Sequence, residues 1–211
     1  MKFEVIMEPF PHIIGTDVWD DEELELIWQE LNYFTKPGKL RNPVDYGAVS
    51  GKTTSKAIAL SDVFKENYMD MSNIVSLQPN LLKKLAPHLD KWSRSHYSLY
   101  DVKSAKKTHY KIRYYHDGEG YVGHTDSPFC YLIFMYIHKE PKQFSGGELY
   151  FEDFGTEFSC DHNSLIVLPS YVKHGVRTVS IDDQNYHAGN GRYAITLFLD
   201  YHRNRGKNDR I

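Results

Sequence analysis

The second half of the chain alternates between apolar and polar positions with a period of two, which is typical of half-buried strands. From about residue 107, eight short apolar or aromatic runs recur between turn signals. The runs are HYKIRYYH, GYVGHTD, CYLIFMYIH, GELYFEDF, EFSCDH, SLIVLPS, HGVRTVSI and RYAITLFLDYH. Because the connections between them are too short for crossover helices, the pattern predicts an antiparallel sandwich or barrel.

The first half is expected to be mostly helical. A capping-box-like start at Asp20 and apolar residues spaced for one helical face predict a helix over about 21–34. Similar spacing predicts helices over about 61–69 and about 79–92. The Pro- and Gly-rich stretch 36–60 is expected to be irregular and to form a lid.

These patterns predict one domain spanning 1–211, mainly β with N-terminal helices. Residues 1–106 are expected to supply mostly helical support that packs on one sheet. Residues 107–202 are expected to form the barrel core, and the basic end 203–211 a solvated tail.

Composition narrows the possible partners. The chain has 211 residues, a net charge of -3 and no long basic block, so a nucleic-acid partner is not expected. No apolar run reaches the roughly 18 residues that a membrane span needs, and the first residues lack a signal-peptide pattern, so a cytoplasmic protein is expected. The two cysteines, Cys130 and Cys160, have no CxxC partner and predict free thiols.

A candidate metal site begins with His124 and Asp126, which lie two positions apart and therefore share one face of an extended strand. His174, which opens the run HGVRTVSI, is the natural third ligand. Two histidines and one carboxylate form the facial triad of non-haem Fe(II) oxygenases, which leaves positions open for substrate and dioxygen. His187 is the alternative third ligand, although it stands in a predicted loop.

A candidate anion anchor opens the last predicted strand. Alternation places Arg192, Ala194 and Thr196 on one face. A guanidinium inside a barrel is costly unless it is paired, and its planar fork suits a carboxylate. A cosubstrate such as 2-oxoglutarate, which chelates iron at one end and presents a free carboxylate at the other, would explain its burial.

Four motifs in order carry a resemblance to a known family. They are the His124–Asp126 pair, GGELYF at 146–151, LPSYVKHGV ending at 176, and RYAITLF from Arg192. Over roughly residues 107–202 they resemble the prolyl 4-hydroxylase type of Fe(II)/2-oxoglutarate-dependent dioxygenase. The resemblance implies a double-stranded β-helix, a squashed barrel of eight antiparallel strands. The link between His174 and Arg192 is longer than this family leads us to expect.

The resemblance also implies roles for individual residues. Three residues would ligate Fe(II): His124, Asp126 and His174. Arg192 and Tyr136 would bind the distal carboxylate of 2-oxoglutarate, and Tyr114 would lie beside the cosubstrate. Thr196 shares the strand face of Arg192, from which it could reach the cosubstrate or iron-bound water. Tyr115 is adjacent to Tyr114, and a shift of one residue would turn the side chain to the other face. Core packing is the alternative for both tyrosines and for Thr196.

The activity implied is oxidative decarboxylation of 2-oxoglutarate, with O2, to succinate and CO2, coupled to hydroxylation of a peptidyl proline. The sequence leaves open whether ascorbate is needed to reduce oxidised iron. A free amino acid or another small molecule is the alternative substrate, because barrel motifs fix the cosubstrate and leave the substrate to loops. Nucleic-acid demethylases of the superfamily carry a second Arg six positions after the first, where this chain has Phe198.

Two alternatives come from other classes of protein. A zinc hydrolase would use the same three ligands with a nearby general base, for which Glu148 and Glu152 are candidates. A non-catalytic metal-binding barrel would keep the ligands but would not need the Arg anchor. The sequence leaves the oligomeric state open.

Overall fold

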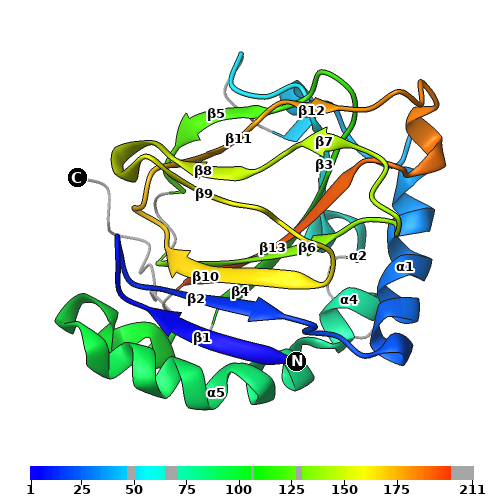
Figure 1. The fold of residues 1–211 in the computed structure, drawn as a ribbon. Helices are drawn as coiled ribbons and strands as arrows, with labels where there is room; N and C mark the ends of the chain where they lie inside the picture. The colour runs from blue at the N-terminus through cyan, green and yellow to red at the C-terminus, as the bar shows by residue number, and fades with distance from the viewer. Residues whose placement is uncertain (47–50, 65–70, 106, 127–129, 201–211) are drawn as a thin grey trace, which may run out of the picture.

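The computed structural model describes residues 1–46, 51–64, 71–105, 107–126 and 130–200. Two antiparallel sheets face each other, with helices outside the larger sheet (Figure 1). The seven strands of the larger sheet are, in spatial order, β1 (Lys2–Ile6), β2 (His12–Thr16), β10 (Ser164–Pro169), β6 (Tyr131–Ile137), β13 (Arg192–Asp200), β4 (Lys107–Tyr115) and β3 (Lys56–Ala59).

The smaller sheet has four strands, ordered β5 (Tyr121–His124), β11 (His174–Val176), β8 (Leu149–Phe151) and β9 (Thr156–Phe158). A short pair joins β12 (Val179–Ser180) to β7 (Ser145–Gly146). The α-helices are α1 (Asp21–Thr35), α2 (Leu60–Phe64), α4 (Asn73–Ser76) and α5 (Gln78–Ser95). Four 3-10 segments complete the described elements: η1 (Pro43–Tyr46), η3 (Tyr97–Ser104), η4 (Glu152–Phe154) and η5 (Tyr186–Ala188). Two facing antiparallel sheets are the architecture of a double-stranded β-helix, so the predicted fold class is confirmed.

Alternation along the strands builds two apolar cores. Ile112, Met135 and Ile195 point from the outer face of the larger sheet into a core shared with α1 and α5. Tyr115 and Phe134 point from its inner face toward the smaller sheet. Because neighbouring strand residues face opposite cores, every second side chain of the larger sheet points into the space between the two sheets.

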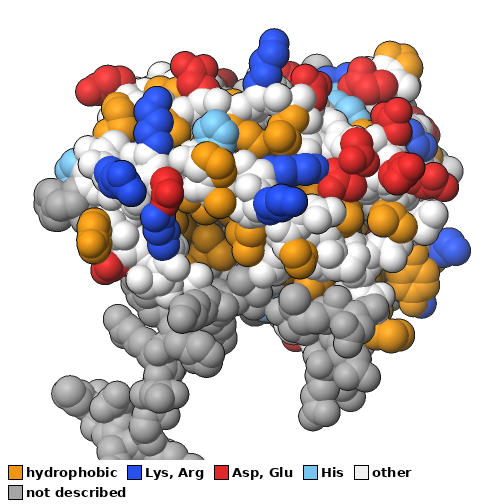
Figure 2. All heavy atoms as spheres, turned by 90° about the horizontal axis from the view of Figure 1, so that it is seen from below, with side chains coloured by type: hydrophobic (Ala, Val, Ile, Leu, Met, Phe, Trp, Pro, Cys, Tyr) orange, Lys and Arg blue, Asp and Glu red, His pale blue; other side chains and the backbone are white. Residues whose placement is uncertain are grey.

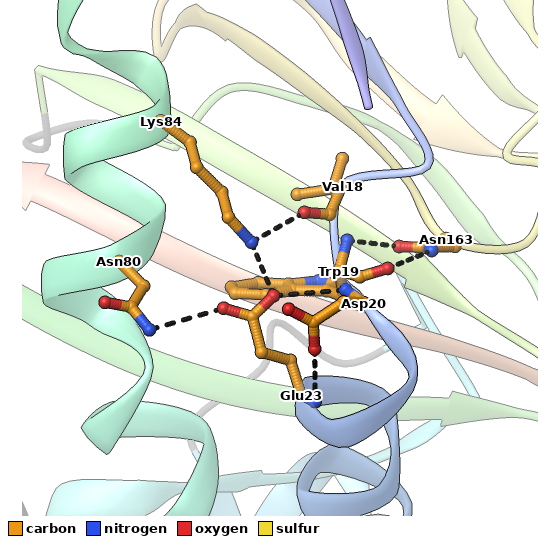
Figure 3. Close-up of polar contacts among 7 residues, drawn as sticks. All are labelled: Val18, Trp19, Asp20, Glu23, Asn80, Lys84 and Asn163. Carbon is orange, nitrogen blue, oxygen red and sulfur yellow. Dashed lines mark hydrogen bonds and ion pairs between the residues drawn. The ribbon is translucent and has the colours of Figure 1, made fainter.

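Helix α1 is fixed at its start by a reciprocal capping box. The Glu23 N–H donates to Asp20 Oδ1 at 2.9 Å, and the Asp20 N–H donates to Glu23 Oε2 at 3.1 Å. Lys84 of α5 donates to the same Glu23 carboxylate (Figure 3). The Asn163 side chain bonds both backbone polar groups of Trp19, so this corner ties α1 and α5 to the turn before β10.

The predicted helices are found, with two qualifications. Helices α1 and α5 match the predicted ranges to within a few residues, whereas α2 ends at Phe64 and residues 65–70 lie outside the described residues. The first 106 residues also contain strands β1, β2 and β3, so the prediction of a mostly helical preface was incomplete. Within the proposed lid, residues 56–59 form edge strand β3, which pairs with β4. The prediction of an irregular segment is therefore wrong there.

Charged side chains of both signs lie on the surface (Figure 2), and neither cysteine forms a disulfide. On the face that carries α5, acidic side chains gather at one end, and Lys and Arg side chains are interspersed with hydrophobic ones (Figure 2). Cys130 and Cys160 are free thiols. None of the described helices has the length and apolar character required to cross a bilayer.

Candidate metal and anion site

Strand pairing places the three predicted metal ligands together. His124 at the end of β5 and His174 at the start of β11 are direct partners in the smaller sheet. Asp126 follows β5, and its N–H donates to the Ser170 carbonyl at 3.1 Å. The Asp126 carboxylate oxygens lie 3.6 Å from His124 Nε2 and 3.5 Å from His174 Nε2. All three side chains offer a ligand atom within 4.8 Å of the others, which is a distance one cation can span.

Backbone carbonyls hold both imidazoles in the tautomer that a metal requires. His124 Nδ1 lies 3.0 Å from the Val122 carbonyl, and His174 Nδ1 lies 2.9 Å from the Val172 carbonyl. Since a carbonyl only accepts, each Nδ1 carries a proton toward its carbonyl, and each Nε2 is the nitrogen turned toward Asp126 and the prospective metal position.

Electrostatics keep these groups in their metal-binding states. Burial, reinforced by the neighbouring His174, lowers the pKa of His124 to about 4, so this imidazole is neutral at physiological pH. Burial opposes ionisation of Asp126, but its hydrogen bond with His174 and the charges around it hold its pKa below the usual value. His124 is therefore held neutral and Asp126 ionised at neutral pH, which are the states in which these two groups bind a metal.

The three ligands open into a cavity between the two sheets. Its lining residues come from strands of both sheets: Lys111, Arg113, Tyr115, Tyr121, His124, Asp126, Phe134, Tyr136, Leu149, His174, Val176, Arg192, Ala194, Thr196 and Phe198. Four of the residues predicted to line the cosubstrate site or its strand face are among them, namely Tyr136, Arg192, Ala194 and Thr196.

Arg192 is buried in this cavity, with 1% of its surface exposed. Its Nη2 donates to Cys160 Sγ at 3.4 Å, and its guanidinium lies 4.8 Å from the ring centres of Tyr115 and Tyr136. Among the described residues, Arg192 Nε and Nη1 and the Tyr136 hydroxyl have no hydrogen-bond partner. A buried cation with unpaired donors is costly, and an anion placed here would satisfy these groups.

Gly147, the second glycine of GGELYF, makes room for this arginine. Gly147 has a φ of +79°, and a Cβ there would lie 2.8 Å from Arg192 Cδ. A side chain at this position would therefore both strain the backbone and displace the guanidinium.

Tyr114 does not line the cavity. In β4 it points to the helix-covered face, where its ring contacts Tyr186 and Tyr193 and its hydroxyl accepts the Gly191 N–H at 2.9 Å. The adjacent Tyr115 faces the cavity and pairs across strands with Arg192. The structure thus favours the core-packing alternative for Tyr114 and gives the position beside the anchor to Tyr115.

Replacing Tyr114 with Phe is expected to lower the free energy of unfolding by about 1–3 kcal/mol, because the buried Gly191 N–H loses its acceptor. Chemical denaturation would measure this loss. Tyr171→Phe, at an exposed ring, is the matched control. A Tyr114→Phe protein as stable as this control would contradict the assigned hydrogen bond.

The alternative residues lie elsewhere. His187 is exposed in η5, and its Nδ1 bonds the Thr35 carbonyl at 2.6 Å. Neither Glu148 nor Glu152 lines the cavity, and the Glu152 carboxylate pairs with Lys173 at 2.8 Å. The structure therefore places neither candidate base of the hydrolase alternative in the cavity with the three ligands.

A second group of potential ligands, His138, Glu140 and His162, also meets the 4.8 Å criterion. Two of its ring nitrogens contact protein atoms, whereas His138 Nε2 is buried without a hydrogen-bond partner among the described residues. His138 Nδ1 lies 3.0 Å from the Lys139 carbonyl, and His162 Nδ1 accepts the His138 N–H at 3.2 Å. None of its three residues lines the cavity that contains His124, Asp126, His174 and Arg192.

Sequence reasoning overlooked three residues around the cavity: Cys160, Lys111 and Arg113. Lys111 and Arg113 share the inward face of β4 with Tyr115. Two cations at alternate positions of an otherwise apolar strand, HYKIRYY, were the available signal. Nothing in the local pattern around Cys160 indicated its contact with Arg192.

Near Arg113, burial raises the pKa of Glu119 to about 7 from its usual value of 4.5. The Glu119 carboxyl group ionises at a lower pH in the unfolded chain than in the folded protein. The free energy of unfolding of the wild type should therefore fall as pH rises from about 5 to about 8. Glu119→Gln has no carboxyl group to ionise at this position. Its free energy of unfolding should therefore rise relative to that of the wild type by about 1–3 kcal/mol between pH 5 and pH 8. Thermal unfolding of both proteins at pH 5 and pH 8 measures the change. A constant difference would contradict the raised pKa.

No protein-family model matches the sequence, and a search of curated proteins finds no relative. Solved structures do share the fold. A Pseudomonas putida prolyl-4-hydroxylase matches with a TM-score of 0.60 and 13% identity over 90% of this chain and 92% of its own. A Trichoplax adhaerens prolyl hydroxylase, solved with a hypoxia inducible factor oxygen degradation domain peptide fragment, matches with a TM-score of 0.61 and 15% identity over 90% and 83%.

A third match broadens this group. The structure of OsALKBH1 aligns with a TM-score of 0.59 and 10% identity over 95% of this chain and all of its own. At these identities the likeness concerns the fold alone, which this chain shares with prolyl hydroxylases and with a Burkholderia pseudomallei oxidoreductase of the 2OG-Fe(II) oxygenase family.

Proposed function

We propose that this protein is an Fe(II)- and 2-oxoglutarate-dependent dioxygenase that hydroxylates a C–H bond of its substrate. One observation carries the proposal: a His–Asp–His group opens into the same cavity as a buried arginine with unpaired donors. The first feature suits a metal that needs open positions, and the second suits a dicarboxylate that reaches from that metal into the protein.

The residues present fit both groups. His124, Asp126 and His174 would hold Fe(II), and Arg192 with the Tyr136 hydroxyl would hold the distal carboxylate of 2-oxoglutarate. Thr196 lies on the Arg192 face of β13 and lines the same cavity. When bound, Fe(II) supplies the oxidation chemistry that converts 2-oxoglutarate, O2 and substrate to succinate, CO2 and hydroxylated substrate. Ascorbate would keep the iron reduced.

The protein supplies orientation and a sheltered cavity. Carbonyls fix both imidazoles, and Phe134, Leu149 and Val176 provide apolar walls that limit water around the reacting groups. A hydrolase would instead need a general base near the metal, and neither Glu148 nor Glu152 lines the cavity.

For the substrate, we propose a peptidyl proline as the first class to test. Its support is the fold shared with prolyl hydroxylases, one of them solved with a peptide fragment. A free amino acid or another small carboxylate is the second candidate, and the cations on the cavity wall favour it.

The test is succinate formation from 2-oxoglutarate by the Fe(II)-loaded protein in air, with and without proline-containing peptides and free amino acids. The proposal predicts Fe(II)-dependent succinate that increases with one of these substrates. Metal-dependent hydrolysis of an ester or amide, without succinate, would support the hydrolase alternative instead.

A further inference from the structure

Two cationic side chains line the cavity on the side away from the Arg192 anchor. Lys111, Arg113 and Tyr115 occupy alternate positions of β4 and all face inward. Their partners across β13 fix the order, because Tyr115 pairs with Arg192 and Lys111 pairs with Thr196. The strand therefore runs from the anchor at Tyr115 to a second cationic region at Arg113 and Lys111.

The surroundings of these two cations suit a planar or charged group. Arg113 is buried, its Nη1 donates to Ser55 Oγ at 3.0 Å, and its guanidinium lies 4.8 Å from the Tyr121 ring centre. The Lys111 ammonium lies 5.5 Å from the Phe198 ring centre. A guanidinium has five N–H donors and an ammonium has three, so both can bind an anion in addition to their protein contacts.

Charge balance separates this region from the cosubstrate. With Fe(II) and 2-oxoglutarate bound, the positive charges of the metal and Arg192 equal the negative charges of Asp126 and the dicarboxylate. Asp126 is the one acidic residue among the described residues that line the cavity. Lys111 and Arg113 are then the remaining cationic side chains of the described cavity wall.

Building on the proposed function, we infer that Lys111 and Arg113 form a subsite for a carboxylate of the substrate. That carboxylate has two possible sources, the α-carboxylate of a free amino acid and an acidic side chain near the target residue of a peptide. In either case the subsite would orient the substrate over the metal through charge-assisted hydrogen bonds.

The test measures binding to protein loaded anaerobically with Fe(II) and 2-oxoglutarate, so that Arg192 is occupied. The probes are free amino acids, proline peptides with and without a neighbouring Asp or Glu, and the amide counterpart of each carboxylate. Calorimetry supplies a readout independent of turnover. We expect the carboxylate to bind about tenfold or more tightly than its amide. Preference for free amino acids or for acidic peptides identifies the source.

Variants locate the effect. Lys111→Met and Arg113→Gln should each remove most of the preference for carboxylate over amide, whereas Arg113→Lys should retain part of it. Lys142→Met removes an exposed cation outside the cavity and should leave the preference intact. The wild-type comparison of acid with amide needs no variant, so it tests the inference even where a variant fails to fold.

Equal affinity for each acid and its amide would overturn the subsite. Failure of the proposed function has a different signature. It would appear as absent 2-oxoglutarate binding in wild-type protein before any probe is added.

Discussion

Replacing His174 with Ala is expected to lower Fe(II)-dependent succinate formation by more than about 100-fold. Loss of a residue that only hydrogen-bonds to a metal ligand typically costs about 10- to 100-fold, and loss of the ligand itself should cost more. His174 is 2% exposed, and its Nε2 faces the Asp126 carboxylate at 3.5 Å. Removing it leaves one imidazole and one carboxylate, which cannot complete a facial triad. Bound iron, measured after desalting, should fall in parallel with turnover.

His187→Ala is the matched control, since this imidazole is exposed and its ring bonds the end of α1. It should retain iron and activity. Circular dichroism of both variants verifies that the fold is intact. Wild-type turnover in a folded His174→Ala protein would rule out the assigned ligand set.

Replacing Arg192 with Met should weaken 2-oxoglutarate binding by about 30- to 1000-fold, or about 2–4 kcal/mol, because the distal carboxylate loses its buried cation. Fe(II) binding should change little, because Arg192 is not one of the three ligand residues. Anaerobic titration with 2-oxoglutarate measures the affinity.

The same variant should unfold at an equal or higher temperature than wild type when no cosubstrate is present. Wild-type Arg192 buries two nitrogens without partners, and Met removes that desolvation cost. Higher cosubstrate affinity in Arg192→Met, or unchanged affinity in a folded protein, would contradict the anchor role. The 2-oxoglutarate affinity of Arg192→Lys should lie between those of the wild type and Arg192→Met, because lysine keeps the charge and lacks the planar guanidinium.

Strong periodicity made most of the fold predictable. The apolar positions of helices α1 and α5 repeat with the helical period. Strands β6 and β13 are almost continuous apolar runs, so each of these elements could be recognised from its own sequence. Strand β3 could not. Its four residues, KAIA, follow a Gly- and Ser-containing stretch, and they become a strand because β4 offers them an edge.

The candidate site divides along the same line. The spacing of His124 and Asp126 and the position of His174 were visible in the sequence, and strand pairing brings them together. The choice between Tyr114 and Tyr115 was not, because alternation specifies two faces without saying which is inward. The pairing of Tyr115 with Arg192 settles that choice. The contact of Cys160 with Arg192 joins residues 32 positions apart and has no local signature.

The most direct test of the central claim is an anaerobic titration of metal-stripped protein with Fe(II) and then 2-oxoglutarate, followed by visible absorption. Our account predicts a metal-to-ligand charge-transfer band that requires both additions, is absent in His174→Ala, and needs more 2-oxoglutarate in Arg192→Met. Tight metal binding without a band in the wild-type protein would contradict the oxygenase assignment and favour a hydrolase or a non-catalytic metal-binding barrel.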